Sequence, residues 1–267
     1  MSSENPAWVY EQHQVKAIFE PWARVLIDIA RPQPGERALD AACGTGVIAR
    51  LVAPMVGTTG KVAGIDFDPL MIEVAGELAS GIEWHHGDLQ KLPLPDQSFD
   101  LVICQQGLQF LPDRNAGLRE MHRVLRPGGR LVLALWTELA KSPGHAILFG
   151  ALGAALGKDM SRPPPWSLAE ESQVLQLIAA AGFVEIEAKV TSLNAAYPSA
   201  RAFVEIYLAG TSKLTRQALE QLPADRKAAF VDEVVTRLHA FETKTGLRVP
   251  IESRLIAARR PSLGAAS

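Results

Sequence analysis

The chain has 267 residues, a formal net charge of −2 and a hydrophobic content of 48%. It is long enough for one large domain with a packed core, and its charge gives no general attraction to nucleic acid or acidic membranes. The first residues are polar and lack the regions of a signal peptide, and no apolar run reaches the length of a bilayer span.

The two cysteines, Cys43 and Cys104, form no CxxC pair and no Cys/His cluster. A disulfide framework or a structural zinc site is therefore not expected, and each cysteine is interpreted as a small buried side chain. We expect a cytoplasmic protein that binds no metal, has no nucleic-acid partner and makes no stable insertion into a membrane.

Residues 1–35 are expected to form an N-terminal helical segment. Apolar residues recur at helical spacing from residue 7 to residue 31, and Pro21 is expected to kink or divide the helix. Its aromatic residues belong either to the core or to a segment that folds over a bound ligand. These residues are Tyr10, Phe19 and Trp22.

A run of small and apolar residues, 38–43, ends in Gly44-Thr45-Gly46, and a helical pattern begins directly after it. This order predicts a strand, a tight turn and a helix N-terminus. Glycine allows close approach of the backbone to a ligand, and the helix start offers unpaired N–H groups. An acid, Asp66, follows at about the twenty-residue spacing of a ribose contact. Alone, the pattern fits a dinucleotide site and a plain strand-to-helix turn equally well.

Short apolar strands alternate with helices through the first half of the chain. Five strands are expected, over residues 37–43, 62–66, 82–86, 99–104 and 130–136, with helices over 47–55, 69–78 and 115–125. This alternation is typical of a parallel sheet that helices cover on both faces. The fold class is therefore α/β, and a ligand is expected at the carboxyl ends of the strands.

After residue 136 the rhythm changes. Helices are expected within 146–156, 168–181 and 198–243, with strands over 183–190 and 248–258. The helices at 141–166 and 198–245 exceed what the sheet needs, so we expect them to form a cap over its carboxyl edge. The chain is accordingly interpreted as one integrated domain, in which a cofactor-binding core (36–140) follows the N-terminal segment and residues 141–267 supply the rest of the sheet and the cap.

The segment Leu39-Asp40-Ala41-Ala42-Cys43-Gly44-Thr45-Gly46 resembles the first motif of class I S-adenosylmethionine-dependent methyltransferases. Later landmarks agree with that family in order and spacing. They are Gly64-Ile65-Asp66-Phe67-Asp68-Pro69-Leu70-Met71, Gly87-Asp88-Leu89, residues 92–100 and Arg123-Val124-Leu125-Arg126-Pro127-Gly128-Gly129-Arg130-Leu131. The most similar subgroup is the type 11 group of ubiquinone and menaquinone methyltransferases. The resemblance implies a Rossmann-like seven-stranded sheet whose last strand, about 248–258, is antiparallel.

The resemblance also implies a site for S-adenosyl-L-methionine, with S-adenosyl-L-homocysteine as the product. Asp66 suits a bidentate contact with both ribose hydroxyls, and Asp40 can pair with the ammonium group of the methionine part. Asp68 is interpreted as a helix cap. The residues implied to bind the cofactor are Asp40, Gly44, Thr45, Gly46, Asp66, Phe67, Met71, Asp88, Leu89 and Gln105.

A sulfonium methyl group is already activated, so its displacement requires alignment and the exclusion of water more than covalent catalysis. A base is needed only if the nucleophile must lose a proton. No spacing singles out a catalytic residue among the candidates His13, His145, Tyr10 and Tyr207. The residues expected to contact the acceptor are Tyr10, Phe19, Trp22, Gln109, Trp136, Phe149 and Tyr207.

These features predict methyl transfer to a small, partly apolar organic acceptor by in-line displacement. A nicotinamide-dependent oxidoreductase is an alternative, because Gly44-x-Gly46 with Asp66 also fits that class; Asp40 before the glycines and the Pro127-Gly128-Gly129 turn argue against it. A non-catalytic cofactor-binding protein of the same fold is the other alternative.

Overall fold

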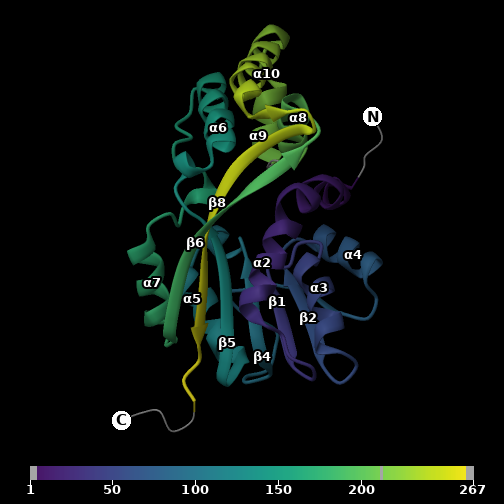
Figure 1. Ribbon diagram of the computed structural model, residues 1–267, viewed down its shortest axis with the longest axis vertical. Coiled ribbons are helices and arrows are strands. Elements are labelled where there is room, and N and C mark those ends of the chain that lie inside the picture. Colours follow the sequence, from purple (N-terminus) through teal and green to yellow (C-terminus); the bar gives the residue numbers. More distant parts are fainter. Residues whose placement is uncertain (1–4, 211–212, 263–267) are drawn as a thin grey trace.

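The computed structural model describes residues 5–210 and 213–262. Its centre is an eight-stranded mixed sheet with the order β3-β2-β1-β4-β5-β8-β6, and the short β7 pairs with β8 (Figure 1). The strands are β1 (Arg37–Ala41), β2 (Lys61–Asp66), β3 (Glu83–His86), β4 (Phe99–Gln105), β5 (Leu125–Trp136), β6 (Val184–Tyr197), β7 (Glu242–Thr243) and β8 (Gly246–Arg259).

Strands β1 to β5 are parallel, and β8 lies antiparallel between β5 and β6. The prediction of a Rossmann-like sheet with an antiparallel last strand is therefore confirmed. In the centre of the sheet Leu39 faces Ala63 of β2 on one side and Val102 of β4 on the other. This order brings the carboxyl ends of β1, β2 and β4 together at one edge.

Eleven helices or helical segments of four or more residues lie among the described residues. They are α1 (Pro6–Val9), the π-helix η1 (Tyr10–Phe19), α2 (Glu20–Ala30), α3 (Val47–Val56), α4 (Pro69–Leu78), α5 (Arg114–Val124), α6 (Pro143–Leu156), α7 (Glu171–Ala180), α8 (Ala200–Gly210), α9 (Lys213–Glu220) and α10 (Ala224–Leu238). Short 3₁₀ turns are η2 (Leu108–Phe110), η3 (Leu139–Lys141), η4 (Pro164–Trp166) and η5 (His239–Phe241).

The sheet is buried on both faces because alternate residues of its strands enter two separate cores. Ala38 and Leu101 pack with α2 and α3 on one face, whereas the next residues, Leu39 and Val102, pack with α5 and α7 on the other. A strand covered on both sides needs apolar residues at every position. In β4 all seven residues are buried.

Two long strands connect the sheet to the helices beyond residue 141. Strands β6 and β8 have 14 residues each, and β8 pairs with β5 only from Ser253 to Arg259. Residues 247–252 therefore pair with β6 and not with β5, and they form a ribbon that the short β7 joins at Leu247. Helices α6, α8, α9 and α10 gather at its end, above the carboxyl edge of the sheet (Figure 1).

The N-terminal helix divides at Glu20, as expected from Pro21, which lacks an N–H group and fits the first turn of α2; the preceding segment is a π-helix. Two strand boundaries differ from the sequence-based expectation. Strand β5 starts at Leu125, which pairs with Phe99 across an irregularity in the register. The strand expected over 183–190 continues to Tyr197. Among the described residues no helix combines the length and the apolarity that crossing a bilayer requires.

Candidate active site

A cavity of about 890 Å³ lies at the carboxyl ends of β1, β2 and β4, between η1, α4 and the helices that follow residue 141. Polar residues from the strand ends form one half of its wall, among them Asp66, Asp88, Gln105 and Gln106. Aromatic and aliphatic residues form the other half. They include Trp136, His145, Phe149, Trp166, Tyr197, Tyr207 and Ile251.

Asp66 is the last residue of β2 and lines the cavity. Its Oδ2 accepts a hydrogen bond of 2.8 Å from the Gly44 N–H, and its Oδ1 accepts one of 2.9 Å from the Asp68 N–H. These two backbone groups fix the orientation of the carboxylate. Burial raises the pKa of Asp66, an effect that the backbone hydrogen bonds oppose.

Asp40, which the resemblance implied as a cofactor residue, lies outside the cavity wall. It is 3% exposed, and its Oδ2 accepts a hydrogen bond of 2.9 Å from the N–H of Ala49 in the first turn of α3. Burial raises the pKa of Asp40 to about 7, and the charge of Asp66 adds to the shift. In this structure Asp40 therefore satisfies a backbone donor at the start of α3.

The two glycines of the turn have different neighbours. A Cβ atom on Gly44 would lie 3.4 Å from the ring of Tyr10, and both residues line the cavity. Gly46 has a φ of +83°, and a Cβ atom on it would collide with the indole ring of Trp84. Gly46 is thus required by the left-handed backbone and by packing, and it does not line the cavity.

The π-helix η1 is fastened to the glycine turn through one carboxylate. Glu11 accepts a hydrogen bond of 2.5 Å from the Thr45 hydroxyl and one of 2.7 Å from the Arg50 guanidinium. Tyr10, the neighbour of Glu11, lines the cavity and packs against Phe19 with ring centroids 5.2 Å apart. The N-terminal segment therefore lies over the cavity, and the Thr45 hydroxyl is already hydrogen-bonded to Glu11.

The end of the cavity beside α4 holds Phe67, Met71, Asp88 and Leu89. Phe67 is 74% exposed, so its ring offers a free apolar surface. Asp88 accepts a hydrogen bond of 2.8 Å from the Gln90 N–H. Asp68 also lines this end, and its side chain accepts a hydrogen bond of 2.9 Å from the Leu70 N–H, which makes it the cap of α4 as interpreted from the sequence.

Three glutamines lie at the end of β4 or shortly after it, in different positions. Gln105 lines the cavity and donates to the Phe19 carbonyl at 2.9 Å, while its enclosed Oε1 has no hydrogen-bond partner. Gln106, with a φ of +57°, accepts from the Trp136 N–H at 3.0 Å and from Gln109 at 2.9 Å. Gln109, expected to contact the acceptor, is buried behind Gln106 and outside the cavity wall.

The apolar half of the cavity is a set of aromatic rings from distant segments. Trp136 stacks on Trp166 with centroids 6.2 Å apart, and Phe149 meets Trp166 edge-on at 5.5 Å and Tyr207 edge-on at 5.4 Å. Trp22, another expected acceptor contact, lies in the core and reaches only the edge of Trp136. Among the described residues, the charged side chains that line the cavity are three aspartates at the end beside α4: Asp66, Asp68 and Asp88.

The four candidate bases lie in different places. Tyr10, Tyr207 and His145 line the cavity, and His13 lies on the exposed surface outside it. Burial raises the pKa of both tyrosines, so each keeps its proton at neutral pH. Burial lowers the pKa of His145 to about 4, so its imidazole is neutral.

Several lining residues carried no signal in the sequence. They include Gln14, Ile18, Phe110, Leu111, Met160, Pro164, Pro165, Ile206 and Ile251. Most are apolar and belong to loops or to elements beyond residue 141, where no motif indicates which face turns inward. Only the aromatic richness of the cap pointed to this wall. Within the described residues no three His, Cys, Asp or Glu side chains group as metal ligands would.

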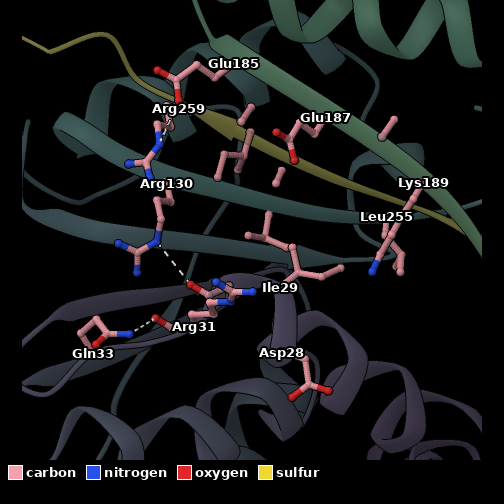
Figure 2. A pocket seen from close by; sticks show the side chains of 16 residues that line it. Asp28, Ile29, Arg31, Gln33, Arg130, Glu185, Glu187, Lys189, Leu255 and Arg259 are labelled. Atoms are coloured by element: carbon pink, nitrogen blue, oxygen red, sulfur yellow. Dashed lines mark hydrogen bonds and ion pairs between the residues drawn. The ribbon is translucent and has the colours of Figure 1, made fainter.

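A second cavity, of about 690 Å³, opens on the sheet face beside α2 (Figure 2). Arg130 and Arg259 at its rim already have carboxylate partners, Glu36 at 2.8 Å and Glu185 at 3.1 Å. It lies at the start of β5, whereas ligands of open α/β sheets bind at the carboxyl ends of the strands. The first cavity is therefore the candidate active site.

Comparison with known proteins gives matches that centre on the first half of the chain. The family described as "Methyltransferase domain" matches residues 39–133. The 2-phytyl-1,4-naphtoquinone methyltransferase of Synechococcus elongatus is 40% identical over 118 residues, 42% of this chain and 51% of that protein. The demethylmenaquinone methyltransferase of Staphylococcus epidermidis is 39% identical over 126 residues, 46% of this chain and 50% of that protein. The chain thus spans about half the length of these curated relatives.

Among solved structures, phosphoethanolamine N-methyltransferase 2 of Haemonchus contortus, in complex with S-adenosyl-L-methionine, has a similar fold. The match covers 91% of this chain and 53% of that chain, with a TM-score of 0.56 and 19% sequence identity. At this identity the likeness concerns the fold alone.

Proposed function

We propose that the protein transfers a methyl group from S-adenosyl-L-methionine to a small, partly apolar acceptor, on the premise that residues 39–133 match the family described as "Methyltransferase domain". The observation that carries the proposal is the fixed carboxylate of Asp66. It stands at the carboxyl end of β2, beside bare Gly44 backbone, in a cavity of about 890 Å³.

The residues at this end of the cavity fit the cofactor. The two oxygens of Asp66 are held by separate backbone donors and suit the two neighbouring ribose hydroxyls. Phe67 and Met71 offer polarizable surface for the adenine face, and Asp88 with the backbone of Leu89 suits its polar edge. Gln105, whose enclosed Oε1 has no partner, borders the methionine end.

When bound, the sulfonium supplies an activated methyl group and a neutral leaving sulfide. The chain contributes the alignment of the two reactants and the exclusion of water. Trp136, Phe149 and Tyr207 enclose the acceptor from above, and Tyr10 and Phe19 enclose it from the N-terminal side. Tyr10 and Tyr207 are protonated at neutral pH and His13 lies outside the cavity, so none of these three residues is assigned as the catalytic base.

For the acceptor we propose the reduced, hydroxylated form of a quinone or a related ring compound. The two sequence relatives are named as methyltransferases of a naphthoquinone and of demethylmenaquinone. The aromatic wall formed by Trp136, Trp166 and Phe149 suits a flat ring. The match to the methyltransferase domain favours this function over the oxidoreductase and the non-catalytic binding protein.

The test is an incubation of the protein with S-adenosyl-L-methionine and a panel of hydroquinones, naphthols, phenols and amines, analysed by mass spectrometry. A methylated hydroquinone or naphthol, formed in step with S-adenosyl-L-homocysteine, is the expected result. Quenching of protein fluorescence by NADH, with no affinity for S-adenosyl-L-homocysteine, would instead establish the oxidoreductase alternative. Affinity for S-adenosyl-L-homocysteine without turnover of any acceptor would favour the binding protein.

A further inference from the structure

We infer that His145 is the polar anchor of the acceptor, a positioning residue that hydrogen-bonds a hydroxyl group on an uncharged aromatic ring. This inference rests on the proposed function and specifies the chemistry of the acceptor. It concerns the half of the cavity that the cofactor residues do not reach.

His145 lies in the first turn of α6 and is 3% exposed. Its neighbours are aromatic rings: Trp166 at 5.2 Å, Phe203 at 5.3 Å and Tyr207 at 6.3 Å between centroids. Yet the residue also belongs to the cavity wall. A polar ring in an otherwise aromatic wall is therefore presented to whatever occupies the cavity.

The imidazole of His145 has no hydrogen-bond partner among the described residues, and its Nδ1 is fully enclosed. A buried polar group without a partner destabilises a fold, so such groups are usually satisfied by protein, water or ligand. Because protein encloses Nδ1, which stays without a partner, Nε2 is the ring nitrogen that a ligand in the cavity can meet. A bound molecule can therefore supply a hydrogen-bond partner to Nε2.

The charge of the site defines what this partner is. Burial lowers the pKa of His145 to about 4, and the N-terminal turn of α6 also disfavours a cation, so the ring is neutral. Among the described residues that line the cavity there is no lysine, arginine or glutamate, and the three aspartates lie at the end beside α4. A phosphate, carboxylate or ammonium group on the acceptor would find no counter-charge beside His145 among these residues.

A hydroxyl group fits this position better than any other uncharged group. It can donate to Nε2 or accept from it, so it satisfies either tautomer of a neutral histidine, whereas an ether oxygen can only accept. The rings of Trp166 and Phe149 beside His145 suit the faces and edges of an arene. The acceptor class is therefore an uncharged hydroxyarene, such as a hydroquinone or a naphthol.

The test compares 1-naphthol with its methyl ether, 1-methoxynaphthalene, by calorimetry on the full chain saturated with S-adenosyl-L-homocysteine. The wild-type protein is expected to bind the naphthol about tenfold more tightly, the ratio that one hydrogen bond contributes. His145→Phe should remove this preference by weakening naphthol binding alone. His145→Gln, which keeps a polar group, should restore part of it, and the exposed His239→Gln serves as the matched control.

Equal affinities in the wild type, no binding of either probe, or a tenfold preference that survives in His145→Phe would overturn the assignment. Should His145→Phe fail to fold, the ratio measured with His145→Gln decides, since a purely structural role leaves that ratio unchanged. Titration of S-adenosyl-L-homocysteine into each variant tests the proposed function separately. If the wild type has no affinity for it, the two naphthalene probes are compared in the protein alone.

Discussion

The carboxylates of Asp40 and Asp66 end neighbouring strands but have different partners. Asp66 faces the cavity and is held by the N–H groups of Gly44 and Asp68, whereas Asp40 is enclosed and holds the N–H of Ala49. The resemblance assigned both to the cofactor. The motif residues therefore include Asp66, which lines the cavity, and Asp40, which supports the glycine turn from outside the cavity.

Replacing Asp40 with Asn should change how stability depends on pH. The folded-state pKa of Asp40 is about 7, above the ordinary value, so the folded state favours the protonated carboxyl. The stability that this provides is complete below the unfolded pKa near 4 and is lost as the pH rises through 7. Between pH 5 and pH 8 the wild type should lose about 2.5 kcal/mol relative to Asp40→Asn.

Urea unfolding of both proteins at half-unit pH steps measures this difference. Asn keeps the oxygen that accepts from Ala49, so the two proteins should have similar stability below about pH 4, where Asp40 is protonated in both states. If the free energies of unfolding of the two proteins changed in parallel with pH, the pKa of Asp40 would be the same in the folded and unfolded states, and the account of its burial would be wrong.

Gly64 is required by the packing of a single ring. A Cβ atom on this residue of β2 would collide with the indole of Trp84, while one on Gly76 of α4 would lie 3.9 Å from the same ring. Gly64→Ala should therefore destabilise the protein by about 1–3 kcal/mol through overpacking. Gly76→Ala, the matched control, should stabilise the helix by up to about 1 kcal/mol. Thermal unfolding of the two variants checks the opposite signs.

At the scale of elements, the N-terminal segment depends on one small group of contacts with the glycine turn. Glu11 of η1 binds both Thr45 and Arg50. Since Tyr10 and Phe19 of the same segment line the cavity, this carboxylate holds one wall of the site in place. The π-helical backbone of η1 is typical of segments that serve a site.

Glu11→Ala should accelerate the release of S-adenosyl-L-homocysteine. The variant loses two charge-assisted hydrogen bonds that hold η1 over the turn, which corresponds to a dissociation rate increased about tenfold or more. Stopped-flow displacement measures this rate. Glu20→Ala, which removes an exposed pair with Arg24 on the next helix, is the control and should leave the rate unchanged. Equal rates in the two variants would mean that η1 does not retain the ligand.

The sequence predicted the central strands well, because they are buried on both faces and their middle residues are apolar, as over 101–104 in β4. It predicted β6 poorly. Most of that strand is exposed, and its last residues pair with β8 beyond the end of β5, so apolar patterning could not reveal its length. The π-helical form of η1 has no signature in residue spacing at all.

For the whole molecule, the two halves of the cavity differ in how they are encoded. In the half of the cavity proposed to bind the cofactor, the residues lie at the ends of strands or in the turns after them. Asp66, Asp88 and Gln105 could therefore be identified from motif spacing. The acceptor half is assembled from segments far apart in the chain, which converge only because β6 and β8 extend beyond β5. Which of their side chains turn inward depends on tertiary packing, so Trp22 and Gln109 were expected in the wall and Ile251 was not.

The measurement that tests the account most directly is calorimetric titration of S-adenosyl-L-homocysteine into the wild type, Asp66→Ala and Asp113→Ala. Asp113 is a matched control, because its carboxylate caps α5 and does not itself line the cavity. The account predicts binding to the wild type and to Asp113→Ala, and an affinity at least about 100-fold lower for Asp66→Ala, the loss of two charge-assisted hydrogen bonds. Unchanged affinity in Asp66→Ala, or no binding to the wild type at high micromolar concentration, would contradict it.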